Sequence, residues 1–276
     1  MTERTEIDTG TEELLCHIEE RVGVITLNKP KKKNALGDIL TPALRRAVLT
    51  LDERNDVGCV MITGAGDAFC SGGDVSGMGS GASKPSGPPP TKSERIAELT
   101  HKQATLTLRI HELSKVTIAA LPGVAAGAGL SIALACDLRV ASDNAFITTA
   151  FKNIGLSGDY GASWFLPRLI GLAKARELYY TADRVYAEEA ERLGIFNRVY
   201  PQDTFREEAL AFAASIANGP TNTYRRMKVN LNSGMDQSLR DSVVLEATHL
   251  IESSGEGEAK EAIQAFMEKR PPQFHK

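Results

Sequence analysis

Two glycine-rich turns are the segments of this chain best suited to chemistry. They are residues 68–74 (AFCSGGD) and 123–129 (GVAAGAG), and each follows an apolar run, at 58–63 and 116–121, that is typical of a buried strand. Glycine and alanine let a ligand approach the backbone closely, and glycine also accepts positive φ. Two such turns on neighbouring strands can aim two backbone N–H groups at one point. The pattern therefore predicts an oxyanion hole, in which paired donors stabilise negative charge developing on a substrate oxygen.

The elements that position these turns are inferred from hydrophobic periodicity. Besides the two apolar runs, strands are expected at 14–18, 22–27, 138–140 and 145–148. Helices are expected at 38–52, 94–113, 130–136, 203–217, 222–232, 237–251 and 256–269. The helix at 130–136 is apolar on almost every face, so it should be buried. This alternation of short strands and helices implies an α/β fold.

Length and charge limit the possible classes. A chain of 276 residues can form one large domain or two small ones. We find no boundary within residues 1–200 and only a softer transition near Pro201, after which helices dominate. The net charge of −3 is too small to suggest a nucleic-acid partner.

Cysteine and histidine usage and the N-terminal sequence exclude further classes. The four cysteines are scattered and resemble reduced small hydrophobes, which indicates a reducing compartment. Neither they nor the five histidines have the spacing of zinc ligands, so no metal is expected. We find no signal peptide and no apolar stretch long enough to cross a bilayer. The protein is therefore predicted to be cytoplasmic, with no membrane partner.

Two segments leave other interpretations to weigh. Residues 64–66 (GAG) and 127–129 (GAG) follow strands, as in dinucleotide-binding proteins, but neither continues as G-x-G-x-x-G into a helix. This disfavours a dinucleotide site. Residues 77–90 are rich in glycine, serine and proline and predict a mobile loop, since that composition cannot pack a core. A plain surface insertion and a lid over the site are both open for it.

Seven short motifs, in order along the chain, resemble the crotonase superfamily, the enoyl-CoA hydratase/isomerase family. They are 28–36 (NKPKKKNAL), 68–74, 123–129, 136–137 (CD), 155–156 (GL), 166–171 (LPRLIG) and 265–270 (AFMEKR). Each is weak alone, but their order and spacing are specific and cover nearly the whole chain. The resemblance implies a superhelix of ββα turns over residues 1–200 that holds the acyl-CoA site. It also implies a helical region at 201–276 that builds homotrimers or dimers of trimers.

The resemblance also implies a substrate and the residues that bind it. The substrate would be an acyl-CoA thioester, with CoA as part of the substrate and no separate cofactor. The N–H groups of Gly73 and Ala128 would hold the thioester oxygen, and Ala128 gains from positive potential if it begins the short helix. Asp74 is expected to stabilise the turn or cap it. The residues assigned to the CoA part are Lys29, Ala35, Ala68, Gly72, Asp74, Phe266 and Lys269, the last two reaching a neighbouring subunit.

The carboxylates expected over the acyl chain differ from those of the family's hydratases. Where those enzymes carry two glutamates, this chain has Ser131 and Phe151, which cannot replace them in moving protons. Asp159 remains, before a helix that carries Trp164, in an apolar setting that would raise its pKa. A proton shuttle and a helix cap are both open for Asp159. Ser131, Phe151 and Trp164 are assigned to the acyl pocket.

One carboxylate suffices for an isomerase, because the same group can remove a proton from one carbon and return it to another. We therefore expect an acyl-CoA isomerase that shifts a double bond through a thioester enolate, with Asp159 as acid and base. The open alternatives are an enoyl-CoA hydratase, an acyl-CoA hydrolase or lyase on the same fold, and a non-catalytic acyl-CoA-binding protein.

Overall fold

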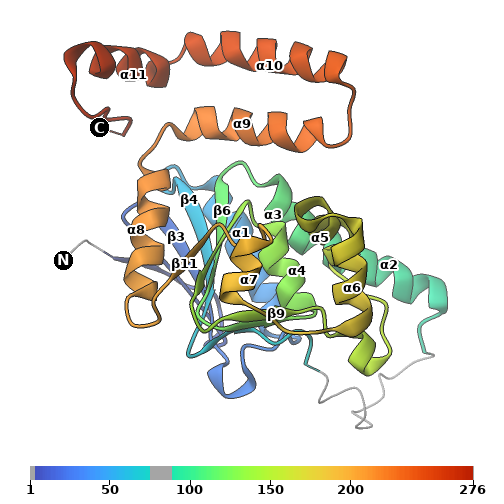
Figure 1. The fold of residues 1–276 in the computed structure, drawn as a ribbon. Coiled ribbons are helices and arrows are strands. Elements are labelled where there is room, and N and C mark those ends of the chain that lie inside the picture. Colours follow the sequence, from blue (N-terminus) through green and yellow to red (C-terminus); the bar gives the residue numbers. More distant parts are fainter. Residues whose placement is uncertain (1–3, 75–88, 276) are drawn as a thin grey trace.

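The computed structural model describes residues 4–74 and 89–275, and its larger sheet has seven strands (Figure 1). Their order is β1 (Thr5–Ile7), β2 (Leu14–Glu19), β3 (Val22–Leu27), β4 (Cys59–Gly64), β6 (Val116–Leu121), β8 (Leu138–Ser142) and β11 (Arg198–Tyr200). The first three strands pair antiparallel, and every pair from β3 to β11 is parallel. The strands from β3 onward therefore end at a common edge.

A second sheet is formed by the segments that follow the strands of the first sheet at that edge. It has the order β10 (Val185–Tyr186), β9 (Phe146–Thr148), β7 (Val124–Ala126) and β5 (Ala68–Cys70). β5 follows β4, β7 follows β6 and β9 follows β8, so each repeat of the chain gives one strand to each sheet. β5 and β7 pair in parallel, with Ala68 opposite Val124 and Cys70 opposite Ala125. The two glycine-rich turns predicted from the sequence are therefore neighbours.

Helices cover both faces of the larger sheet. Along β4, Val60 and Ile62 join the main core while Cys59 and Met61 face α8 (Phe205–Ala217), as the alternation of side chains along a strand requires. The other helices are α1 (Leu40–Glu53), α2 (Lys92–Gln103), α3 (Arg109–Glu112), α4 (Ala128–Ala135), α5 (Ala162–Ile170), α6 (Leu172–Thr181) and α7 (Ala187–Arg192). All residues of α4 are buried, as its sequence predicts.

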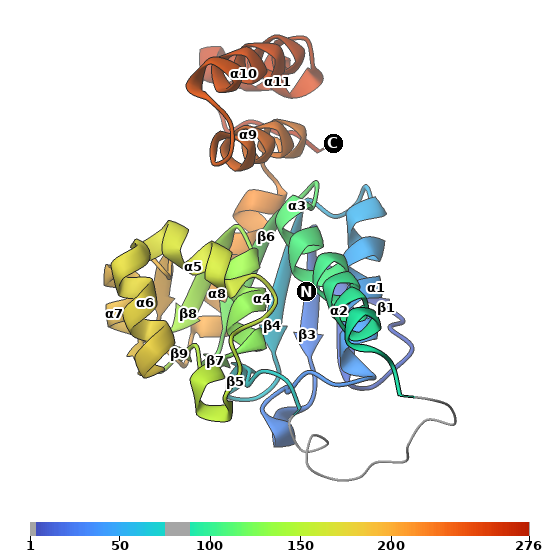
Figure 2. The same ribbon diagram turned by 90° about the vertical axis from the view of Figure 1, so that its right-hand side faces the viewer.

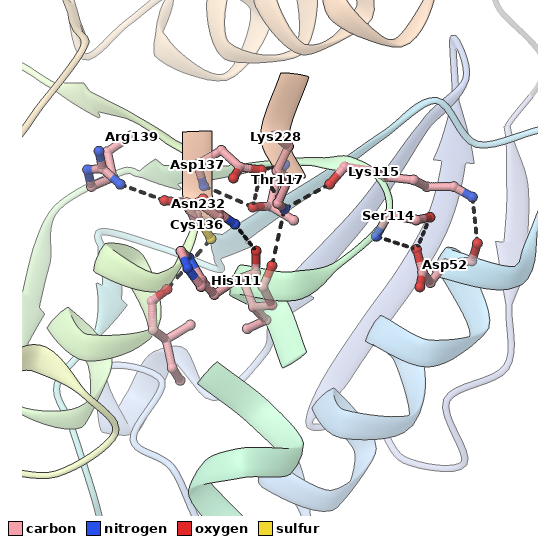
Figure 3. A network of polar contacts seen from close by, with 12 residues as sticks. Asp52, His111, Ser114, Lys115, Thr117, Cys136, Asp137, Arg139, Lys228 and Asn232 are labelled. Atoms are coloured by element: carbon pink, nitrogen blue, oxygen red, sulfur yellow. Dashed lines mark hydrogen bonds and ion pairs between the residues drawn. The ribbon is translucent and has the colours of Figure 1, made fainter. Parts of the chain in front are cut away.

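The last three helices stand apart from the sheets (Figure 1). They are α9 (Thr221–Gly234), α10 (Leu239–Ser254) and α11 (Gly257–Glu268). α9 is joined to the core by a buried polar network, in which Lys228 Nζ lies 2.8 Å from Asp137 Oδ2 (Figure 3). The same carboxylate oxygen accepts hydrogen bonds from the backbone N–H (2.7 Å) and the hydroxyl (2.9 Å) of Thr117. Lys228 also donates to the carbonyl oxygen of Lys115 at 3.1 Å.

The α/β fold and most of the predicted elements are confirmed, and two of the predicted segments differ. The helix expected at 94–113 is α2, a π-helical segment η3 (Ala104–Leu108) and α3. The three-residue strands β5 and β7 lie within segments predicted as turns, because each is too short to show a period. The loop predicted at 77–90 falls largely outside the described residues. In the described part of the chain, no helix is long and apolar enough to cross a membrane.

Candidate active site

The end of β5 directs one backbone donor toward β7. Leu36 forms a parallel bridge with Gly73, in which the Leu36 N–H donates to the Gly72 carbonyl (2.8 Å) and the Asp74 N–H donates to the Leu36 carbonyl (2.7 Å). Hydrogen-bonding groups alternate between the two sides of a strand. The N–H of Gly73 therefore faces away from Leu36 and toward the side on which β7 lies.

The second turn places another donor beside the first. Gly127 has φ +51°, and α4 begins immediately after it. Ala128 is therefore the first residue of the short helix, which was the condition for a favourable helix potential at its N–H. Gly72 has φ +102°, and a Cβ placed on it would lie 3.1 Å from the Ala126 carbonyl oxygen and 3.7 Å from the Ala128 nitrogen. Neither the Gly73 N–H nor the Ala128 N–H donates a hydrogen bond to another described residue. The two turns that carry these donors therefore lie side by side, with Ala128 at the positive end of a helix, and the convergence of both donors on one ligand oxygen stays a prediction.

The loop that carries Asp159 is fixed to the second turn by hydrogen bonds. The Ser131 hydroxyl lies 3.0 Å from the Asp159 carbonyl oxygen and 3.2 Å from the Gly127 carbonyl oxygen. The side-chain oxygen of Gln103 accepts from the Tyr160 N–H at 3.0 Å. Gly158, with φ +113°, gives the loop a conformation that favours glycine. The backbone of Asp159 is thus held while its side chain is not.

The Asp159 carboxyl has the properties of a proton-transfer group. Its Oδ1 is buried and has no hydrogen-bond partner within residues 4–74 and 89–275. Burial raises the pKa of Asp159 to about 6, because the apolar surroundings penalise the charged form. The helix-cap alternative is wrong: α5 begins at Ala162, its N-cap is Gly161, and no side chain caps it.

Phe151 lies between the second turn and the Asp159 loop. A Cβ placed on Gly127 would lie 3.7 Å from one ring carbon of Phe151, and a Cβ placed on Gly158 would lie 3.7 Å from another. Phe151 also stacks on Tyr179 of α6, with ring centroids 6.0 Å apart and planes at 24°. Phe151 stands where the family's hydratases carry their second glutamate. Its ring therefore forms an apolar surface between the second glycine-rich turn and the Asp159 loop.

Trp164 lies on α5, the helix that begins just after the Asp159 loop. It borders a hollow of about 340 Å³ together with Gln103, Thr107 and Gly161. Its indole packs edge-on against His111, with centroids 5.3 Å apart. Gln103 and Gly161 flank the Asp159 loop, so the hollow adjoins the site. The assignment of Trp164 and Phe151 to one acyl pocket stays a prediction.

The residues assigned to CoA in the N-terminal part of the chain gather around the first turn. Ala35 and Ala68 are buried there, and Asp74 pairs with Lys32 at 3.0 Å. Lys29 is largely buried, with its Nζ 3.5 Å from Glu13 and 3.9 Å from Asp74. Lys29 is thus already paired with carboxylates, and its role toward CoA stays a prediction.

Asn34 organises this region. It is fully buried and has φ +56°, and its side-chain oxygen accepts from the Lys29 N–H at 2.9 Å. Its amide nitrogen donates to the carbonyl oxygens of Ala65 (3.0 Å) and Ala68 (2.7 Å). Asn34 therefore ties the 28–36 motif to the start of β5. The motif contains Asn34, but the sequence alone did not indicate this role.

Phe266 and Lys269 are not brought to the site within one chain. Both lie at the end of α11, which stands opposite the edge that carries β5 and β7 (Figure 2). Phe266 is 85% exposed. Their predicted contact with CoA would need a second copy of the chain.

Sequence reasoning missed Gln103 and Tyr179, and it did not foresee that Ser131 holds Asp159. These three residues come from the end of α2, from α6 and from α4, at least 20 residues from Asp159. The group of glycines around Asp159 is the only local signal that other chain segments approach closely. Within the described residues, no cluster of three or more metal-ligating side chains is found.

Comparisons with known proteins show the family to which this chain belongs. The sequence model of the family "Enoyl-CoA hydratase/isomerase" matches residues 17–276. A "Probable enoyl-CoA hydratase" from Rhodobacter capsulatus is 36% identical, covering 93% of this chain and 95% of its own. The "1,2-epoxyphenylacetyl-CoA isomerase" from Escherichia coli is 31% identical, covering 95% and 97%.

A solved structure extends the agreement to three dimensions. The structure of a putative enoyl-CoA hydratase from Streptomyces coelicolor A3(2) superposes with a TM-score of 0.86 at 33% identity, covering 95% of this chain and 94% of the other. The chain therefore belongs to the enoyl-CoA hydratase/isomerase family, the crotonase superfamily, and has its fold.

Proposed function

We propose that this enzyme isomerises an unsaturated acyl-CoA by moving a double bond along the acyl chain. The observation that supports the proposal is the buried carboxyl of Asp159, which has no hydrogen-bond partner among the described residues and whose backbone carbonyl Ser131 links to that of Gly127. The two positions at which the family's hydratases carry glutamates hold Ser131 and Phe151.

The reaction follows from these groups. The thioester oxygen of a 3-enoyl-CoA binds to the N–H groups of Gly73 and Ala128, and the Asp159 carboxylate removes a proton from carbon 2. The electron pair forms an enolate, whose charge on the thioester oxygen each donor stabilises by on the order of 3 kcal/mol. Protonated Asp159 then returns the proton to carbon 4 and leaves a 2-enoyl-CoA. A pKa of about 6 makes both protonation states accessible near neutral pH.

Hydration would need a second group to orient and deprotonate water. The Ser131 hydroxyl is close to two carbonyl oxygens, those of Gly127 and Asp159, which occupy its proton. Phe151 has no polar atom in its side chain. The relative named 1,2-epoxyphenylacetyl-CoA isomerase supports an isomerase, whereas several others bear hydratase names.

The rest of the proposal concerns CoA and assembly. CoA enters as part of the substrate, with no separate cofactor, and the residues around the first turn together with Phe266 and Lys269 of a neighbouring subunit bind it. A homotrimer or a dimer of trimers would bring those subunits together. Large apolar side chains that are exposed on α9–α11 support such an interface: Leu231, Leu239, Leu250, Ile251, Phe266 and Met267.

The reaction can be tested with 3-hexenoyl-CoA and 2-hexenoyl-CoA in deuterated water, with the products identified by mass spectrometry. We expect 3-hexenoyl-CoA to become 2-hexenoyl-CoA, with deuterium incorporated in those turnovers in which the proton held by Asp159 exchanges with solvent before its return, and we expect no 3-hydroxyhexanoyl-CoA. Rapid formation of 3-hydroxyhexanoyl-CoA would identify a hydratase instead. Release of free CoA would identify a hydrolase, and binding without turnover of any acyl-CoA in a broader panel would indicate a non-catalytic protein.

A further inference from the structure

The Tyr179 hydroxyl is a second polar group beside Asp159 that has no partner. It is buried and, like Asp159 Oδ1, makes no hydrogen bond to any residue that the structure describes. Ser163 on α5 is near enough to stabilise the ionised form of Tyr179, but its geometry does not give a hydrogen bond. Burial of an unpaired hydroxyl is unfavourable unless something else supplies the partner.

Tyr179 lies at the same point of the molecule as the Asp159 loop. A Cβ placed on Gly158, the residue before Asp159, would lie 3.3 Å from Tyr179 Cε1 and 3.6 Å from its hydroxyl oxygen. The ring of Phe151 also stacks on the Tyr179 ring. The charge of Asp159 is close enough to oppose ionisation of the Tyr179 hydroxyl.

The position of Tyr179 is fixed from both sides. The hydroxyl of Thr149 donates to the carbonyl oxygen of Leu178 at 2.8 Å, and the hydroxyl of Thr148 donates to the carbonyl oxygen of Ala182 at 2.8 Å. These bonds attach the end of α6 to β9 and the segment after it, directly beside Phe151. The backbone on either side of Tyr179 is therefore held in place while its hydroxyl has no partner among the described residues, and the same holds for Asp159.

A purely aliphatic acyl chain would leave this hydroxyl unpaired when the site closes around it, because carbon and hydrogen cannot accept its proton. We propose that Tyr179 is a specificity-determining residue, and that the acyl group which this site selects carries an oxygen substituent beyond the thioester that accepts a hydrogen bond from the Tyr179 hydroxyl. The substrate class is thus an oxygen-bearing acyl-CoA. This inference rests on the proposed function, and it specifies which class of acyl group the proposed acyl-CoA site prefers.

The test compares binding of saturated ligands, which cannot be isomerised. Hexanoyl-CoA and its 4-, 5- and 6-hydroxy derivatives are titrated by calorimetry into the full-length protein. We expect at least one hydroxylated ligand to bind about tenfold or more tightly than hexanoyl-CoA, the range for a polar site that recognises a hydroxyl. Tyr179→Phe, which keeps the ring on Phe151, should abolish that preference and change the Kd of hexanoyl-CoA by less than about twofold.

The neighbouring Tyr180 provides the control, since it is 73% exposed. Tyr180→Phe should keep the preference of the unaltered protein. The inference is overturned if no hydroxylated ligand is preferred, or if the preference survives in Tyr179→Phe. Since these ligands do not react, a preference that depends on Tyr179 would stand even if no isomerisation were found, so failure of the reaction and failure of this inference are separate results.

Discussion

Asp137 and Asp159 are two carboxylates in shielded positions of one chain, and their surroundings differ completely. Asp137 accepts hydrogen bonds from Thr117 and pairs with Lys228, which attaches α9 to the core (Figure 3). Asp159 has a buried oxygen with no partner in the described chain, although its backbone is held by Ser131. The comparison separates a charge used for structure from one that is kept available for a ligand.

This difference predicts how each region responds to mutation. A buried pair whose hydrogen bonds are complete contributes to the folded state, and removal of one member leaves the other uncompensated. A group without hydrogen-bond partners gives the fold no bond that its removal could take away, so we expect its role to lie in the proposed chemistry. Loss of activity and loss of stability should therefore occur in different variants.

The largest effect is expected for Asp159→Asn on catalysis. An amide of the same shape cannot accept the proton from carbon 2, so the rate of 3-hexenoyl-CoA isomerisation should fall by roughly 10²–10⁴-fold. Steady-state kinetics measure the change. Asp183→Asn, at an exposed position after α6, is the matched control and should stay within twofold. An Asp159→Asn protein that retained its rate would remove Asp159 from the mechanism.

The next largest effect is expected for Lys228→Met on stability. The change leaves Asp137 without its ion pair and should lower the free energy of unfolding by about 3 kcal/mol. Urea denaturation measures it, while the isomerisation rate per folded molecule should stay within twofold. The double variant Lys228→Met/Asp137→Asn should recover part of the loss, because the uncompensated charge is gone. A single variant as stable as the unaltered protein would contradict the structural role of this pair.

The pH dependence of the reaction should follow the raised pKa of Asp159. The base must be ionised in the free enzyme, so kcat/KM for 3-hexenoyl-CoA should rise about tenfold per pH unit below pH 6 and level off above it. Assays between pH 4.5 and 8.5 would show the inflection. A profile that is flat between pH 5 and 7 would mean that another group limits proton removal.

A smaller effect is expected for Ser131→Ala. The change removes the hydrogen bond that holds the Asp159 carbonyl oxygen, while the Gly127 carbonyl keeps its bond from the Ser131 backbone N–H. The value of kcat/KM should fall by about tenfold, which corresponds to about 1.4 kcal/mol. Ser215→Ala removes a comparable hydroxyl-to-carbonyl bond on α8 and should leave kcat/KM unchanged. Equal effects of both changes would exclude a positioning role for Ser131.

The sequence predicts the long elements and the oxyanion turns but not the contacts that complete the site. α1 and α8 follow from amphipathic periodicity, and the glycines of residues 68–74 and 123–129 mark a close approach of two backbones. The partners of Asp159 lie 28 residues away at Ser131, and Gln103 lies 57 residues from Tyr160. Such contacts depend on how the strands and helices pack, and no local pattern contains that information.

The cap alternative for Asp159 shows the same limit. A carboxylate just before a helix is a common N-cap, and the sequence could not separate this role from proton transfer. The positive φ values of Tyr160 (50°) and Gly161 (81°) turn the chain so that the cap position falls on Gly161. The glycines in this segment suggest a turn, but they do not specify which residue caps.

The most direct test of the distinction between these regions is the stability of Asp159→Asn as a function of pH. Burial raises the pKa of Asp159 from its ordinary value near 4 to about 6, so between these pH values the folded protein holds a proton that the unfolded chain has lost. The contribution of Asp159 to stability therefore falls as the pH rises through this window, and the asparagine variant lacks this contribution while it keeps every other titrating group. Urea denaturation of both proteins at pH 4 and pH 8 should show the stability difference moving in favour of Asp159→Asn at the higher pH. A difference that stays constant or moves against the variant would mean that the Asp159 carboxylate is stabilised in the folded protein, which would contradict the account.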